Sequence, residues 1–94
     1  MSKGKTDHMQ QKQQTLQRQL RALGPLMRGS VVRIGTRSKQ YYFSLNKDKK
    51  TRLIYLGDKR VELARQYSDN YKKLLCIVEK MTILNMEIVK QSES

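Results

Sequence analysis

Residues 29–57 read GSVVRIGTRSKQYYFSLNKDKKTRLIYLG, and this stretch decides the fold class of the protein. β-Branched and aromatic residues cluster there in three short runs, 30–34, 40–45 and 51–56. The segments between the runs are rich in turn-forming residues and strongly basic. This pattern predicts a three-stranded antiparallel meander.

Alternation along the second run predicts which side of this sheet is buried. Tyr41, Phe43 and Leu45 share one face, because successive side chains of a strand point to opposite sides. The apolar residues expected to complete this buried face are Val32, Ile34, Ile54 and Leu56. The opposite face is then expected to hold Val31, Arg33, Tyr42, Ser44, Leu53 and Tyr55.

A shorter helical pattern precedes the sheet. Three leucines share one face of a helix, namely Leu16, Leu20 and Leu23. Asp7 is a candidate N-cap, and the Gly24-Pro25 pair is a strong stop, so the pattern predicts a helix over residues 7–24. Its apolar stripe is too narrow to stand alone, and we expect it to pack against the helix at the C-terminal end of the chain.

A longer helical pattern follows the sheet, over residues 58–91, with Asp58 as a candidate N-cap and no Pro or Gly after it. Apolar residues alternate there by three and four, which is typical of a coiled-coil seam. The expected oligomer interface consists of Tyr67, Tyr71, Leu74, Val78, Met81, Asn85 and Ile88. Asn85 either fixes the register from a buried position or faces solvent. The poor helix formers at 68–70 leave a break in this helix open.

Together these elements predict an α+β fold, with an N-terminal helix, a three-stranded antiparallel sheet and a long C-terminal helix that carries the seam. We expect a single domain over residues 7–94, preceded by a disordered basic arm over residues 1–6. The 94 residues can bury only a modest core. The seam and the small core predict a homo-oligomer.

Positive charge is concentrated in the first part of the chain. The net charge is +12, and residues 1–57 hold thirteen Lys and Arg against two acidic residues. Such a balance favours a polyanionic partner, because Lys and Arg neutralise phosphates and release counterions. We therefore expect nucleic-acid binding, to duplex DNA rather than RNA and with low sequence specificity. The residues expected to make the contacts are Arg33, Arg37, Lys39, Tyr42, Lys47, Lys49, Lys50 and Arg52.

Other interpretations stay open at this point. The basic face could dock on an acidic protein, as in an interaction or inhibitor protein, or the chain could be chiefly a structural oligomer whose charge serves solubility. Tyr42 and Tyr55 could stack on bases, although tyrosines in a small sheet more often belong to the core. A single basic residue could equally be part of a generic solvated surface.

Composition argues against several classes of function. With one cysteine, Cys76, and one histidine, His8, the chain cannot by itself supply a structural zinc site or an intrachain disulfide. No nucleophile has an evident base and no glycine-rich phosphate loop occurs, so we expect no enzyme activity, cofactor or small-molecule substrate. No apolar run is long enough to cross a membrane, and we expect a cytoplasmic protein.

About two-thirds of the chain, residues 29–90, is similar to a family of small uncharacterised prokaryotic domains found beside or within transposase-like genes. The matching motifs are Gly29-Ser30-Val31-Val32-Arg33, Tyr41-Tyr42-Phe43-Ser44-Leu45, Lys50-Thr51-Arg52 and Asn70-Tyr71. Many members carry cysteines in the first turn, which suggest metal binding, whereas this turn has Ser38 and no cysteine. The order of elements also resembles the arm-type DNA-binding domain of tyrosine recombinases. The resemblance implies an accessory role in a mobile element.

Overall fold

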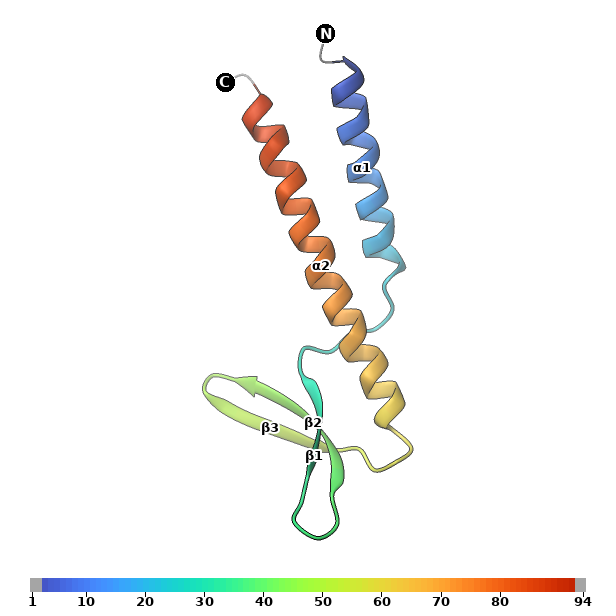
Figure 1. Ribbon diagram of the computed structural model, residues 1–94, viewed down its shortest axis with the longest axis vertical. Helices are drawn as coiled ribbons and strands as arrows, with labels where there is room; N and C mark the ends of the chain where they lie inside the picture. The colour runs from blue at the N-terminus through green and yellow to red at the C-terminus, as the bar shows by residue number, and fades with distance from the viewer. Residues whose placement is uncertain (1–2, 93–94) are drawn as a thin grey trace. The chain divides into compact units, whose positions relative to one another are not determined.

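The computed structural model describes the backbone of residues 3–92 and the side chains of residues 7–92 (Figure 1). The elements follow one another as α1 (Lys3–Ala22), β1 (Ser30–Ile34), β2 (Gln40–Lys47), β3 (Lys50–Tyr55) and α2 (Val61–Gln91). The three strands form one antiparallel sheet in the order β1-β2-β3. The predicted α+β architecture is therefore confirmed.

The chain divides into two compact units, and the single domain over residues 7–94 stays a prediction. The helical unit combines α1 with the part of α2 from Lys73 onward, and the sheet unit spans Gly24–Lys72. Helix α2 is continuous, so it contributes to both units, and the break considered at residues 68–70 does not occur.

Both helices begin at residues other than those expected. Helix α1 already begins at Lys3, so residues 3–6, expected in a disordered arm, are helical, and residues 1 and 2 lie outside the described part. Helix α2 begins at Val61, and the Arg60 carbonyl accepts its first hydrogen bond, from Ala64 N–H at 3.0 Å. Asp58 therefore is not the N-cap. The Arg60 guanidinium donates to the carbonyls of Leu56 and Tyr55, which fastens the helix start to the end of β3.

The strand register corrects the expected faces of the sheet. Val31 lies opposite Phe43, and Arg33 opposite Tyr41, so both share the face of Phe43. Val32 and Ile34, expected on that face, lie on the other one. The error arose because β1 is apolar on both sides, so its own sequence does not show which side is buried.

The core of the sheet unit lies between the Phe43 face and the first turns of α2. Its buried residues are Phe43, Leu56, Val61 and Ala64, and Met27, Val31 and Tyr41 pack against them. Gly29 lies against this core with a φ of 147°, and a Cβ there would come within 2.7 Å of the Phe43 ring. Phe43, only 4% exposed, is the most buried residue of the sheet.

Two polar residues of α2 hold the linker between α1 and β1. The Ser68 hydroxyl donates to the Gly29 carbonyl at 2.9 Å, and the Asn70 amide donates to the Pro25 carbonyl at 2.8 Å. Both side chains are buried, at 5% and 9% exposure. These residues looked like helix breakers because they bond readily to backbone groups, and here they bond to another segment while the helix continues.

Replacing Asn70 by alanine is expected to lower the free energy of unfolding by about 1–3 kcal/mol, because the Pro25 carbonyl would lose its donor in a partly buried place. Urea denaturation followed by circular dichroism measures the loss. The neighbouring Asp69→Ala provides the control, since Asp69 is exposed and its loss should change stability by no more than about 0.5 kcal/mol. An equal effect of both substitutions would contradict the role of Asn70.

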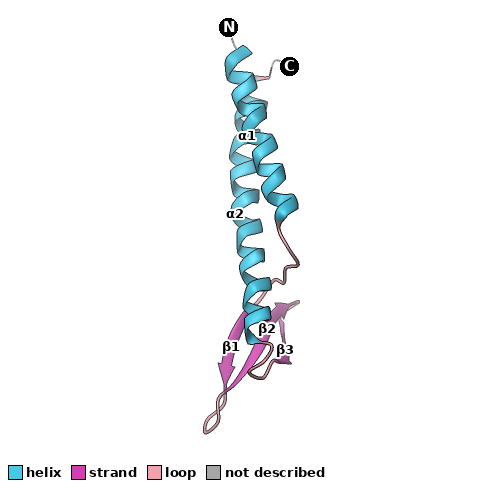
Figure 2. Ribbon diagram, turned by 90° about the vertical axis from the view of Figure 1, so that its right-hand side faces the viewer, coloured by secondary structure: helices cyan, strands magenta, loops and turns pink. Residues whose placement is uncertain are grey.

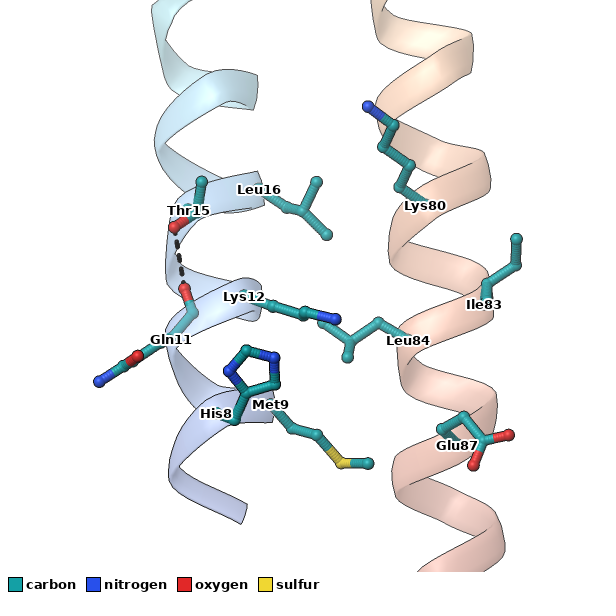
Figure 3. A pocket seen from close by; sticks show the side chains of 10 residues that line it. All are labelled: His8, Met9, Gln11, Lys12, Thr15, Leu16, Lys80, Ile83, Leu84 and Glu87. Carbon is teal, nitrogen blue, oxygen red and sulfur yellow. Dashed lines mark hydrogen bonds between the residues drawn. The ribbon is translucent and has the colours of Figure 1, made fainter. Parts of the chain in front are cut away.

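In the helical unit, α1 and the C-terminal part of α2 run antiparallel and side by side (Figure 2). Leu16 of α1 and Ile77 of α2 are its buried apolar residues. Figure 3 shows Leu16 and Leu84 pointing from the two helices into a groove of about 760 Å³ between them. The predicted pairing of the first helix with the C-terminal helix is confirmed.

Part of the predicted oligomer seam is used inside the chain. Leu74, Met81 and Ile88 are half-buried and lie near Ile77 on the face of α2. Asn85 accepts a hydrogen bond from the Gln13 side chain of α1 at 3.0 Å. Tyr67 and Tyr71 belong to the sheet unit, and only Val78 among the seam residues is a largely exposed apolar side chain, at 47%.

Candidate nucleic-acid interface

The hairpin between β2 and β3 carries the densest positive charge of the sheet unit. Lys47 and Lys50 lie directly opposite each other, and Asp48 and Lys49 form the turn between them. Both turn residues have positive φ, 54° and 62°, which is the geometry of a type I′ turn. Because this turn contains only two residues, Lys47 and Lys50 pair directly across it, and their side chains lie on the same side of the hairpin.

Three of the predicted contact residues gather on this side. Arg52 lies opposite Leu45 in the register, so Lys47, Lys50 and Arg52 all share the Phe43 face of the sheet. Lys47 and Arg52 border a groove of about 640 Å³ in the sheet unit. The groove is lined by Met27, Arg28, Phe43, Leu45, Lys47, Arg52, Leu53 and Ile54. We call Arg28, Lys47, Lys49, Lys50 and Arg52 the hairpin cluster.

Arg28 is a member of the hairpin cluster that the sequence did not reveal. Its guanidinium donates to the Asn46 carbonyl at 3.0 Å, which ties the linker to the end of β2. Arg28 precedes the first strand by two residues and therefore lay outside the strands and basic turns from which the contact residues were predicted. In the sequence, only its charge marks Arg28 as a candidate contact residue. The conformation of the linker that brings Arg28 to the hairpin depends on the hydrogen bonds from Ser68 and Asn70.

Arg33 lies apart from the hairpin cluster, over the ring of Tyr41. Its guanidinium carbon is 5.3 Å from the ring centroid, and that of Arg65, from α2, is 5.7 Å away. Both arginines are exposed residues, and the half-buried ring attracts their guanidinium groups through cation–π interaction. Arg65 is a second basic residue that sequence reasoning missed, because it belongs to the helix and not to the basic stretch.

Arg37 and Lys39 lie in the turn between β1 and β2, at the opposite end of the sheet from the hairpin cluster (Figure 1). The eight residues of β2 separate the two turns by about 26 Å. The predicted residues therefore form two separate basic ends and not one patch.

Tyr42 lies on the face that carries no charged residue on any strand. Its ring packs edge-on against Tyr55 with centroids 5.5 Å apart, and Tyr55 donates to Gln40. Tyr42 is half-buried, whereas Tyr55 is 49% exposed. The structure thus separates Tyr42 from the hairpin cluster, because the two lie on opposite faces.

Among the side chains of residues 7–92, the cations of the hairpin cluster have no acidic partner. The one ion pair in this range joins Lys90 to Glu87 at 3.8 Å, within α2. The charge of the hairpin cluster is therefore available to an external anion. In the same part of the chain, no three His, Cys, Asp or Glu residues come together as metal ligands would, and neither helix is long and apolar enough to span a membrane.

Comparison of the chain with protein-family models, with curated proteins and with solved structures found no match. The resemblance to the transposase-associated family and the likeness to recombinase domains therefore remain predictions.

Proposed function

We propose that this protein binds nucleic acid through the hairpin cluster. The observation that carries the proposal is the gathering of Arg28, Lys47 and Arg52 around one groove, with Lys49 and Lys50 beside it, without acidic partners among the described side chains. Four cations on the hairpin, joined by Arg28 of the linker, give a density of charge that suits a row of phosphates. We place this activity in the cytoplasm, in an accessory protein of a mobile element.

Duplex DNA is the form of nucleic acid that we propose. A two-stranded β-ribbon fits the major groove, and β2 and β3 form such a ribbon with a tight turn at its end. The charged side chains would then contact phosphates, which carry no sequence information. Low sequence specificity is part of the proposal, because the cations of the hairpin cluster would be engaged by phosphates and not by base edges.

Raising the salt concentration from about 50 to about 200 mM is expected to weaken duplex binding several hundredfold, if the five cations each neutralise one phosphate. Gel shifts with duplex DNA, single-stranded DNA and RNA measure the slope for each form. Binding that is independent of salt would refute the proposal, and tighter binding of RNA or single strands would refute the preference for duplex DNA.

The second candidate is an acidic protein partner, and the apolar floor of the groove favours it. Ile54, which lines the groove, is 57% exposed, and a phosphate backbone would not cover such a side chain. An acidic peptide with apolar residues would satisfy both the cations and the floor. Pull-downs with and without nuclease decide between the candidates, because only a protein partner survives nuclease treatment.

A further inference from the structure

The apolar surface of α2 is wider than α1 can cover. In the helical unit, the apolar residues between Leu74 and Val89 other than Cys76 and Ile83 extend over about 200° of the helix circumference, whereas one packed neighbour covers an arc of about 100°. Ile77 and its half-buried neighbours form the arc beside α1. A second arc stays open, and its exposed apolar residues are Leu75, Val78, Met86 and Val89, at 49%, 47%, 65% and 72% exposure.

This second stripe has the spacing of a helix-packing seam. Leu75, Val78, Thr82, Met86 and Val89 follow one another at intervals of three, four, four and three residues, which amounts to two heptads. The stripe contains no charged residue, and Thr82 directs its hydroxyl to the backbone carbonyl of Val78 at 2.7 Å. The second stripe therefore presents an apolar surface along four turns of helix.

We propose that a second copy of this chain packs its second stripe against the same stripe, antiparallel, to form a dimer with four helices. In a dimer with a two-fold axis, the same stripe of each copy forms its half of the interface. An antiparallel register that places Val78 beside Val89 of the second copy also brings Glu79 within reach of Lys90 of the second copy. Glu79 and Lys90 lie on the same flank of the stripe, so the two-fold axis forms this opposite-charge pair twice.

Sedimentation equilibrium without nucleic acid tests the dimer. The wild-type protein is expected at twice 11.1 kDa. Met86→Glu is expected to yield monomers, because two carboxylates would be placed in the apolar interface. Lys80→Glu is the matched control, since Lys80 is exposed on the side of the same helix that faces away from the second stripe and lines the groove beside α1, and it should leave the dimer intact. A monomeric wild type, or dissociation caused only by Lys80→Glu, would overturn the proposal.

Disulfide trapping tests the orientation and does not depend on the stability of the glutamate variant. In a Cys76→Ser background, mixing Val78→Cys with Val89→Cys chains is expected to give disulfide-linked heterodimers. Neither variant alone should cross-link, because the two-fold axis separates equal positions by about 16 Å along the helices. Absence of the mixed disulfide, or efficient linkage within each single variant, refutes the antiparallel dimer. Neither result would alter salt-dependent binding at the hairpin, so the two proposals are distinguishable.

Discussion

Replacing Lys47, Lys50 and Arg52 together by glutamate is expected to weaken binding to duplex DNA more than a hundredfold at about 0.1 M salt. Each phosphate contact releases counterions, and at this salt concentration one contact is worth about eightfold in affinity. Three lost contacts therefore account for a few hundredfold, before the repulsion of the new carboxylates is added. Gel shifts or fluorescence anisotropy with a labelled duplex measure the change. The slope of the logarithm of affinity against the logarithm of salt concentration should become shallower by about 2.7.

The matched control reverses three cations of α1, Lys12, Arg18 and Arg21, which are exposed and lie in the helical unit. This triple variant has the same net charge as the hairpin variant, and we expect its affinity to stay within about tenfold of the wild type. If both variants lost affinity equally, binding would depend on the net charge of the chain and not on the hairpin cluster. Circular dichroism should show the same helix content for both.

Phe43→Ala is expected to lower the free energy of unfolding by about 3–5 kcal/mol, which is a large share of the stability of a small protein. Phe43 is 4% exposed and joins the sheet to Leu56, Val61 and Ala64. Alanine would leave a cavity between the sheet and α2, and the surrounding residues could fill it only in part. Urea denaturation followed by circular dichroism and by tyrosine fluorescence measures the loss.

Leu53→Ala provides the control for this substitution. Leu53 lies on the other face of the sheet and is 48% exposed, so its truncation should cost about 1 kcal/mol or less. If Leu53→Ala destabilised the protein as much as Phe43→Ala, the uncharged face would also be part of a core. This result would indicate that another part of the protein or a second copy packs against that face.

The predicted elements depended on local chemistry and were largely correct. Alternating apolar residues around Phe43 predicted a half-buried central strand, and Gly24-Pro25 predicted the end of α1, which the structure places at Ala22. Such signals act within a few residues, so they can be recognised without knowing the rest of the chain. The helix starts were wrong because Asp7 and Asp58 are acceptable caps that the chain does not use.

The candidate site could be predicted only in part. The abundance of Lys and Arg in the basic stretch identified Lys47, Lys50 and Arg52, but it also selected Arg37 at the far end of the sheet. Arg28 joins the hairpin cluster because of the conformation of the linker. That linker is held by hydrogen bonds between residues that are 39 and 45 positions apart in the sequence. No local pattern reports such contacts.

By itself, the sequence determined the kinds of elements, their order and the excess of positive charge, because periodicity, turn residues and net charge are properties of short segments. Only the tertiary structure decided which side of β1 is buried, which cations share the hairpin groove, and which apolar arc of α2 is left open by α1. The physical reason is that a side chain's neighbours are set by strand register and helix packing. Both depend on residues far apart in the chain.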